Sequence, residues 1–410
     1  MTFKDLKEAV NLTVIVAALG YFVDMFDITL FGVVRKASLQ AIGITEAADL
    51  LKYGVQLYNY QMIGMMIGGI IWGVLADKKG RTKVIFASIA LYSAGNIANA
   101  FVTNIEMYAL CRLITGIGLA GELGAAITLV AESLPIRLRG LGTTIVATMG
   151  LMGSVAAALF GSMLTWHLAY VVGGVGGILL LFMRYKLSDS AQFTNVVKDK
   201  NIERGNIWML FTKERLPRYI FCILAGIPIY FMTGILFTFS PEILQGLGYT
   251  NQLSAAEALL YGTIGLTIGD LLSGLLSQKL QSRKKSIAFS LVMAMILTVC
   301  FIFYPHTDNS TILALCFLLG ICAGYWAVLI TTAAEQFGTN LRGTVASTVP
   351  NFVRGSAVVA TTLFLFLKTS MGLTSVLAVS TVGFIWFALA LFSLTKLKET
   401  FTQDLNFVEK

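Results

Sequence analysis

Ionisable side chains occur inside stretches of this sequence that are otherwise apolar. Two carboxylates, Asp24 and Asp27, stand three residues apart, which places them on one face of a helix. A second apolar stretch, residues 111–140, carries Arg112 near one end and Glu122 near its middle. A charge near the centre of a bilayer costs roughly 2.5 to 3.5 kcal/mol on insertion scales. We therefore expect these groups to line a polar cavity or a solute path, the alternative being an internal ion pair that only fastens helices together.

Asp27 and Arg112 are candidates for binding and releasing a proton. At a rise of about 1.5 Å per residue, Asp27 lies roughly 10 Å and Arg112 roughly 7 Å from the outer ends of their helices. An aspartate beside an arginine can bind a proton when the pair is broken and release it when the pair forms, because the cation favours the ionised carboxylate. Asp24 is then a second proton site or a substrate contact, or it forms a hydrogen bond between helices.

Arg354 is the candidate for binding a carboxylate. It shares a helical face with Asn351, one turn after Pro350. A proline inside a membrane helix frees a carbonyl group, which is tolerated best where the helix lines a cavity, so we expect a break at Pro350. The planar guanidinium of arginine matches the shape of a carboxylate. The alternative is that Arg354 is neutralised by Asp270 or Glu122.

Further polar and aromatic residues are candidates for contacting a substrate near mid-depth. Glu122 lies about 15 Å along its helix from Glu132, which places it close to the midplane. Pro228 suggests a second helix break at similar depth. A lone polar residue in a membrane helix is as often packing glue as a ligand. The remaining candidates are Tyr325, Trp326, Asn59 and Tyr230, with Gln61 and Tyr261 as weaker ones.

Composition places the chain in a membrane. It is 56% hydrophobic and 13% charged, with a mean hydropathy of +0.78, whereas soluble proteins carry about a quarter charged residues. The net charge of +8 comes mostly from Lys and Arg in short loops between apolar runs, which indicates membrane topology and not a nucleic-acid surface. The five cysteines lie inside apolar runs and the two histidines lie far apart. Neither a disulfide framework nor a metal site is expected.

Apolar runs of about 20 residues have the length that a membrane-spanning helix needs. The sequence predicts twelve such helices, at 11–34, 53–76, 84–101, 107–133, 141–164, 166–183, 219–240, 255–278, 286–304, 311–334, 343–367 and 374–394. Most Lys and Arg residues between them fall on one side, together with segment 184–218 and the tail after residue 394. The positive-inside rule then predicts cytoplasmic termini in a plasma membrane, the bacterial inner membrane. We expect the first helix to stay uncleaved.

The polar segment 184–218 divides six predicted helices from six. We expect it to be a cytoplasmic linker with a short surface helix at 208–211, between bundles formed by residues 1–183 and 219–410. The fold class is thus all-α, an integral membrane protein with twelve helices in two pseudo-symmetric six-helix bundles. Three residues recur 203 positions later: Glu132, Arg139 and Gly140 as Glu335, Arg342 and Gly343. Parallel repeats around a midplane site are typical of transporters.

The loop after the second predicted helix carries a motif. It reads Gly73-Val-Leu-Ala-Asp77-Lys-Lys-Gly80-Arg81-Thr-Lys83, which resembles the cytoplasmic loop motif of the major facilitator superfamily and departs from it only at Thr82. The helix at 107–133 resembles those of the metabolite:proton symporter and sugar porter branches. The resemblance covers the whole chain and implies the twelve-helix fold of that superfamily. A second copy of the loop, at 274–285, lacks the aspartate and the second glycine.

The resemblance also implies roles for individual residues. In proton-coupled members, an aspartate of the first helix and an arginine of the fourth carry out proton coupling, and Asp27 and Arg112 fall on those positions. A cytoplasmic gate is expected to close the inner mouth and favour the outward-facing state through charge pairs at the inner ends of the helices. Its residues are Gly73, Asp77, Gly80, Arg81, Glu132, Arg139, Glu335 and Arg342.

These observations favour a proton-coupled symporter that imports a small polar metabolite by alternating access. If Asp27 pairs with Arg112, the cavity keeps Asp24 and Glu122 against Arg354, a mixed field that suits a carboxylate-bearing or zwitterionic solute. Protons and the bilayer are the other partners; no cofactor beyond the proton gradient and no nucleic acid are expected, and a monomer should suffice. The runner-up is a proton-coupled exporter of a small hydrophobic or siderophore-like molecule. An enzyme is disfavoured because the sequence has no metal cluster and no nucleophile-base pair.

Overall fold

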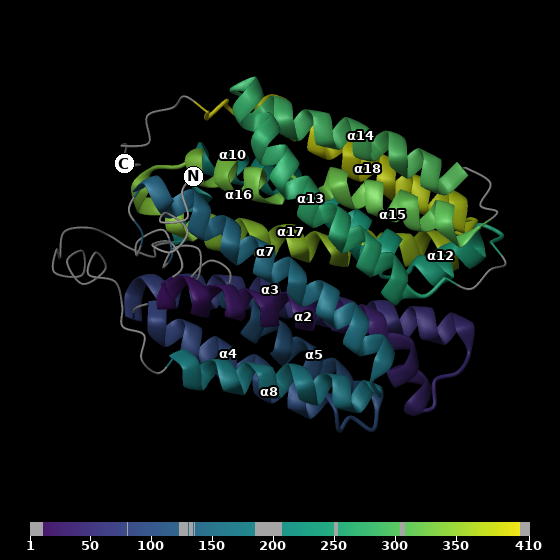
Figure 1. Cartoon of the computed structure of the whole chain (residues 1–410). Helices are drawn as coiled ribbons and strands as arrows, with labels where there is room; N and C mark the ends of the chain where they lie inside the picture. Colours follow the sequence, from purple (N-terminus) through teal and green to yellow (C-terminus); the bar gives the residue numbers. More distant parts are fainter. Residues whose placement is uncertain are drawn as a thin grey trace.

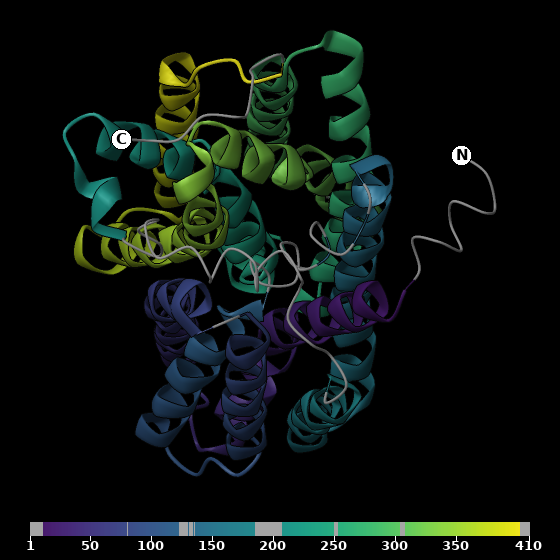
Figure 2. The ribbon, with the colours of Figure 1, turned by 90° about the vertical axis from the view of Figure 1, so that its left-hand side faces the viewer.

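The computed structural model describes residues 11–79, 81–122, 130, 134, 136–184, 207–249, 253–303 and 308–401, and it contains no strand among them. Long helices run side by side in two groups, one from each half of the sequence (Figure 1). Both chain ends lie at the same end of the molecule, and α12 lies at the other. The view from the end that carries the termini separates the two groups clearly (Figure 2).

Six helices of the first half correspond to the first six predicted runs. Asn11 begins the first of them, because its side chain accepts a hydrogen bond from the backbone N–H of Val14 at 2.9 Å. This helix continues seven residues beyond its predicted end at 34. The helices are α2 (Leu12–Ala41), α3 (Ala47–Lys79), α4 (Arg81–Asn99), α5 (Ile105–Leu119), α7 (Ile136–Met163) and α8 (Trp166–Arg184).

The second half begins after η1 (Ile207–Phe211), a short 3-10 helix that confirms the predicted helix at 208–211. The predicted run 219–240 is split into several pieces, and the other predicted runs of the second half are mostly continuous. The pieces are α10 (Arg215–Leu224), α11 (Ile227–Phe231), the π-helix η2 (Met232–Phe237) and α12 (Ser240–Gly246). The others are α13 (Ala255–Leu280), α14 (Arg283–Phe303), α15 (Asn309–Ala323), α16 (Trp326–Glu335), α17 (Thr339–Leu365), η3 (Phe366–Ser370) and α18 (Ser375–Lys396).

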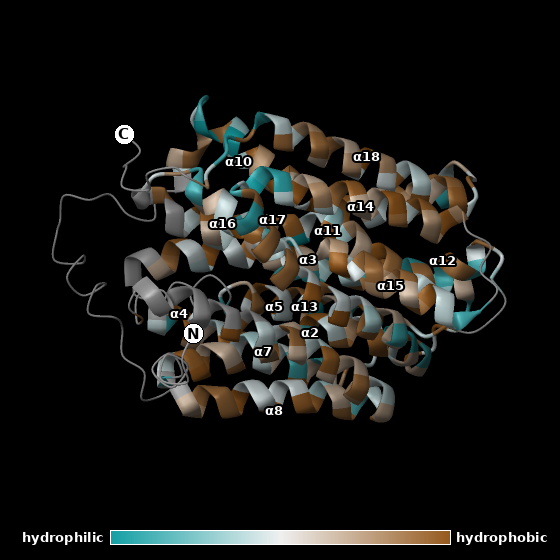
Figure 3. Ribbon diagram, turned by 45° about the horizontal axis from the view of Figure 1, so that its top comes forward, coloured by the Kyte–Doolittle hydropathy of each residue, from teal (hydrophilic) through white to brown (hydrophobic). Residues whose placement is uncertain are grey.

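The surface of these helices is suited to lipid. In the described part of the chain, nine helices are long and apolar enough to cross a membrane. The predicted runs 84–101, 107–133 and 141–164 are not among the nine. Large apolar side chains point outward, including Phe182 and Phe384, which are each 75% exposed. Hydrophobic residues run along the helices, and many of the hydrophilic ones lie toward the two ends (Figure 3).

Two helices that the sequence predicts as continuous are interrupted at related positions. The chain leaves helical geometry after Leu119 in the first half and after Ala323 in the second, next to Gly121 and Gly324, which are 203 residues apart. A Cβ atom on Gly324 would collide with the backbone of α13 at Gly269, so only glycine permits this close approach. Such discontinuous helices typically border the binding site of a transporter.

The two proline predictions have different outcomes. A break near Pro228 is confirmed, because α10 ends at Leu224 and Pro228 lies in the first turn of α11, where its missing N–H costs no helical hydrogen bond. The predicted break at Pro350 is wrong. Helix α17 continues through Pro350, because the flanking turns and the packing against α3 keep the helix together despite the missing donor.

The halves meet along two pairs of helices, α3 with α17 and α7 with α13. Glycines bring α3 and α17 together. A Cβ atom on Gly69 would lie 2.9 Å from the Cβ atom of Asn351, which shows how little space separates the two helices there. Polar contacts join the same pair at Asn59, whose amide oxygen accepts from Thr361 at 2.7 Å.

Candidate functional site

A cavity of about 290 Å³ lies between the two halves and is called the central cavity here. Helices α2, α3 and α7 of the first half and α11, η2, α13, α16 and α17 of the second contribute to its wall. Its volume is near the lower end of the range for small-molecule sites, roughly 300 to 1,000 Å³. The polar and aromatic lining residues include Tyr21, Thr29, Tyr58, Thr148, Ser154, Tyr230, Thr233, Thr238, Thr263, Thr267, Asp270, Trp326, Thr331 and Arg354.

Arg354 of α17 is held in the wall of the central cavity by several groups. Its side chain is 1% exposed. Nε donates to the hydroxyl of Tyr230 at 3.1 Å, and Nη1 donates to Oδ1 of Asn351 at 3.4 Å. The guanidinium carbon lies 6.0 Å from the ring centre of Trp326, within cation-π range. The predicted candidates Arg354, Tyr230, Trp326 and Asn351 therefore lie together, although Asn351 is not part of the cavity wall.

Asp24 provides the counter-charge of Arg354. Its Oδ2 lies 3.7 Å from Nη2 of Arg354, and both side chains are buried. The pair joins α2 of the first half to α17 of the second. Because 3.7 Å exceeds hydrogen-bonding distance, the two charges face each other without a direct hydrogen bond. The prediction that Arg354, if neutralised, would pair with Asp270 or Glu122 is therefore wrong.

Asp270 has a different role in the structure. Its carboxylate accepts a hydrogen bond from the backbone N–H of Ala327 at 3.0 Å, in the first turn of α16. Asp270 thus satisfies a free donor at the start of a helix that follows the break at Gly324. The same carboxylate lies in the wall of the central cavity, across from the first half.

Asp27 and Arg112 are both buried, at 1% and 0% exposure. Arg112 donates from Nη2 to Oε1 of Gln61, and its guanidinium carbon lies 4.4 Å from the ring centre of Phe31. Within the described residues, the carboxylate oxygens of Asp27 have no hydrogen-bond partner. The two residues do not form a contact ion pair in this structure, although Arg112 is among the charges that act on Asp27. Their proposed part in proton coupling stays a prediction.

Three other predicted contacts lie outside the central cavity. The hydroxyl of Tyr325 donates to the carbonyl of Ala225 at 3.1 Å, so Tyr325 ties the break after α15 to the break after α10. Both amide atoms of Asn59 bond to α17, which matches the alternative that it is packing glue. Glu122 is fully buried and is absent from the described wall of the central cavity. A direct substrate contact by these side chains in this conformation is therefore not supported.

Most of the predicted cytoplasmic gate lies outside the described residues. Glu132 and Gly80 are not described, and the same holds for the side chains of Asp77, Arg81, Arg139 and Arg342. Gly73 is buried in α3, where a Cβ atom would lie 3.8 Å from Cγ2 of Thr348 on α17. Glu335 is described in full, and its partners, Arg283 and Thr400, belong to the second half.

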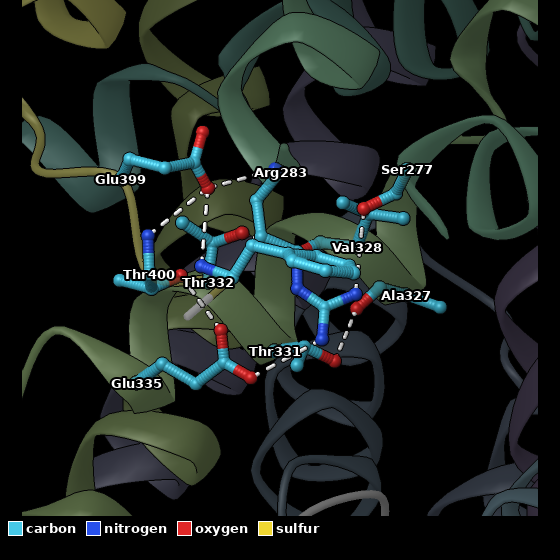
Figure 4. A network of polar contacts seen from close by, with 10 residues as sticks. Ser277, Arg283, Ala327, Val328, Thr331, Thr332, Glu335, Glu399 and Thr400 are labelled. Atoms are coloured by element: carbon cyan, nitrogen blue, oxygen red, sulfur yellow. Dashed lines mark hydrogen bonds and ion pairs between the residues drawn. The ribbon is translucent and has the colours of Figure 1, made fainter. Parts of the chain in front are cut away.

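The contacts of Glu335 form a network at the end of the molecule near the termini (Figure 4). Arg283 at the start of α14 lies 3.3 Å from Oε1 of Glu335, and the hydroxyl of Thr400 donates to Oε2 at 2.7 Å. Glu399 accepts from Ser282 and from the backbone N–H of Arg283 at 2.8 Å. Partial burial alone would raise the pKa of Glu399, but these donors hold that pKa below its ordinary value. The network fastens the chain after α18 to α14 and α16.

Sequence reasoning did not identify Thr263 and Thr267 of the cavity wall, and it named Asp270 only as an alternative partner of Arg354. Thr263, Thr267 and Asp270 lie at positions i, i+4 and i+7 of α13 and so form a stripe on one face. That spacing was a usable signal, because polar residues on one face of a membrane helix commonly face protein or water. Tyr21 lies one turn before Asp24 and gave no separate signal.

The chain was compared with known proteins. A sequence model described as Major Facilitator Superfamily matches residues 17–361. The sialic acid transporter NanX of Escherichia coli is 25% identical over 375 residues, covering 90% of each chain. The 3-(3-hydroxy-phenyl)propionate transporter of Escherichia coli is 27% identical over 369 residues, covering 88% of this chain and 89% of that one. The niacin transporter NiaP of Acinetobacter baylyi is 24% identical over 359 residues, covering 80% of each.

The fold was compared in the same way. The xylose transporter XylE of Escherichia coli, in an inward-open conformation, superimposes with a TM-score of 0.73 at 16% sequence identity, covering 96% of this chain and 97% of that one. At this identity the likeness concerns the fold alone. It agrees with twelve helices in two bundles, which the sequence predicts.

Proposed function

Because this chain belongs to the major facilitator superfamily, we propose that it is a proton-coupled symporter that imports a small carboxylate-bearing or zwitterionic metabolite. It is a multi-pass membrane protein and a secondary transporter, as its relatives are transporters over most of their lengths. Proton coupling, the direction of transport and the class of solute are the proposed parts.

The observation that carries the proposal is the ion pair between Asp24 and Arg354, which joins the two halves beside the central cavity. A solute carboxylate that binds Arg354 would compete with Asp24 for the same cation. Asp24 would then be a buried carboxylate without its counter-charge, which is costly, and a proton would neutralise it. Solute and proton would therefore bind together, which is the requirement for symport. Asp27, close to Arg112, offers a second proton site on α2.

The wall of the central cavity supports the proposed class of solute. Arg354 offers a cation for a carboxylate, and the rings of Tyr230 and Trp326, with centres 6.0 Å apart and planes tilted by 59°, offer apolar surface beside it. Asp270 and several threonine hydroxyls in the same wall can accept or donate hydrogen bonds. Two of the relatives are transporters named for organic acids, sialic acid and 3-(3-hydroxy-phenyl)propionate.

The orientation follows from the distribution of charge. Most Lys and Arg residues of the short loops lie on the side of the termini, so we propose that both termini are cytoplasmic in a bacterial inner membrane. Both halves of the site belong to one chain, so a monomer is the proposed functional unit. No group beyond the proton gradient is needed as a source of energy.

A second candidate is a proton-coupled exporter of a small hydrophobic or siderophore-like molecule. The apolar part of the cavity wall favours it, since Met25, Ile28, Leu151 and Leu266 lie in the same wall. An apolar solute would leave the ion pair of Arg354 and Asp24 intact, so its binding would not drive protonation of Asp24.

Purified protein in sealed liposomes tests both candidates. A panel of labelled carboxylates and their neutral amides is offered outside, with the outside made acidic. Accumulation of a carboxylate that collapses with a proton ionophore, together with proton uptake driven by the solute, supports symport. Solute loss from preloaded liposomes with proton movement in the opposite direction supports export. Solute flux that ignores the proton gradient in both directions would overturn proton coupling.

A further inference from the structure

A second contact between the halves lies at the end of the molecule opposite the termini. Arg35 near the end of α2 donates from Nη2 to Oε1 of Glu242 on α12 at 2.7 Å. The guanidinium carbon lies 4.5 Å from the ring centre of Phe239, and Arg35 is only 2% exposed. Sequence reasoning assigned Arg35 to a loop, but α2 continues to Ala41 and carries it into the interface. We call the pair of Arg35 and Glu242 the distal latch.

The distal latch leaves donors unused. Nε and Nη1 of Arg35 have no hydrogen-bond partner among the described residues, and the same holds for Oε2 of Glu242. Gly54 of α3 makes room for the guanidinium, since a Cβ atom there would lie 2.6 Å from Nη1. A buried arginine with unmatched N–H groups is a strong binding point for a further anion.

A cavity of about 850 Å³ lies next to the distal latch and is called the distal cavity here. It is distinct from the central cavity and shares no lining residue with it. Its wall comes from the ends of α2 and α7 in the first half and from α12 and the start of α13 in the second. The polar lining residues are Arg35, Lys36, Ser162, Glu242, Gln245, Tyr249, Ser254 and Glu257.

The described wall carries two cations, Arg35 and Lys36, and two carboxylates, Glu242 and Glu257, and these charges differ in how each is engaged. Glu242 is already engaged by Arg35, and Glu257 accepts from the backbone N–H and the hydroxyl of Ser254 at 2.9 and 2.7 Å. Lys36 is exposed and forms no ion pair with another described residue. The open cation in the described wall is thus Lys36, the residue next to Arg35 in the sequence.

We propose that the distal cavity is a second binding site for the carboxylate of the transported solute, at which that carboxylate replaces Glu242 on Arg35 and separates the two halves. The proposal rests on the proposed function for the identity of the solute as a carboxylate. Loss of Glu242 alone would leave Arg35 buried and unpaired, which is unfavourable, so the latch opens when another anion takes over the cation. A neutral solute cannot make this exchange. The distal latch would thereby select anions before they reach Arg354.

Distances between spin labels on the two halves test the proposal. Labels are placed on the exposed positions of Gln40→Cys in α2 and Met371→Cys after η3, neither of which lines the distal cavity, with Cys300→Ser removing the exposed native thiol. The full chain is studied in lipid nanodiscs with benzoate as the probe and benzamide as its neutral match. Benzoate should shift the distances to longer values, and benzamide should leave them unchanged. Equal responses to both probes, or none to benzoate, would overturn the proposal.

Two variants locate the response. In Arg35→Gln the benzoate response should vanish, whereas in Arg354→Gln it should persist, because Arg354 belongs to the other cavity. If the benzoate response is lost in Arg354→Gln but kept in Arg35→Gln, the response belongs to the central cavity and the distal site is refuted. A response in the parent without uptake of any carboxylate would overturn the proposed function alone, and carboxylate uptake without a response would overturn the distal site alone.

A substitution at an exposed residue of the distal wall provides a second test if Arg35→Gln does not fold. Lys36→Gln should raise the benzoate concentration for half the response by a factor of about 1.5 to 5, the range for one exposed charge pair. Lys52→Gln is the matched control, since Lys52 is also exposed and is not part of the distal wall. An unchanged concentration in Lys36→Gln, or an equal rise in Lys52→Gln, would contradict the proposal.

Discussion

Replacing Arg354 by lysine tests whether this side chain binds the carboxylate of the solute. Lysine keeps the positive charge but loses the planar group through which Arg354 bonds to Tyr230 and Asn351 at once. Arg354→Lys thus removes at least one well-oriented hydrogen bond to a charged group, which contributes about 1.5 to 3 kcal/mol. This free energy corresponds to a rise in Kd by a factor of about 10 to 150.

Calorimetry on the purified protein measures the change, once a screen by thermal shift has identified a solute. Arg218→Lys is the matched control, because Arg218 donates to the carbonyl of Gln336 at 3.0 Å and is not part of the central wall. Its Kd should equal that of the parent. Proton binding should survive in Arg354→Lys, because the ammonium still faces Asp24. Parental affinity in Arg354→Lys would make Arg354 a structural charge and refute its role in binding the solute.

Five further substitutions test other parts of the structure. Asp24→Asn and Asp27→Asn should each abolish uphill uptake of the solute but leave solute exchange intact. Only Asp24→Asn should also tighten solute binding, because it removes the carboxylate that competes for Arg354. Unchanged accumulation in either mutant would exclude the mutated residue from proton coupling. Asp270→Ala should lower stability by about 0.5 to 2 kcal/mol through loss of the α16 cap, as read by chemical unfolding, and parental stability would show that the cap is dispensable. The pKa of Glu399 is lower in the folded protein than its ordinary 4.5, so the stability that ionised Glu399 contributes is complete above pH 4.5 and is lost as the pH falls through the lowered pKa. Over this acidic range the parent should lose more thermal stability than Glu399→Gln. Parallel curves of thermal stability against pH for the two proteins would exclude a stabilising role of Glu399. Asp77→Asn should shift the population toward the inward-facing state, and identical label distances in mutant and parent would place the gate elsewhere.

The sequence predicted the helices well because a bilayer imposes one length on every apolar run. It also predicted which charges are buried, since Asp24, Asp27, Arg112 and Arg354 are all 1% exposed or less. It did not predict how they pair. Depth along a helix says nothing about the direction in which a side chain points.

Two cases show the physical reason. Asp27 and Arg112 have matching depths, yet Arg112 bonds to Gln61 of a neighbouring helix. Asp24, on the same face as Asp27, reaches Arg354 in the other half. Which helices adjoin is decided by the packing of both halves, and that information is not contained in the spacing within one helix. The role of Arg35 was missed for a related reason, because the end of α2 is set by packing and not by its apolar run.

The break at Gly324 has a consequence for mutational tolerance. Gly324 packs so closely against α13 that any side chain there would displace the backbone of Asp270. By contrast, a Cβ atom on Gly274, which lies in α13 itself, would meet nothing within 4 Å. A saturation library should therefore accept many residues at Gly274 and almost none at Gly324. Because displacement at Gly324 also pulls Asp270 away from α16, the rare accepted residues should change solute preference and not only the amount of folded protein. The break thus couples a close contact between a glycine and a neighbouring backbone to the wall of the central cavity, so variants with altered selectivity are best sought around it.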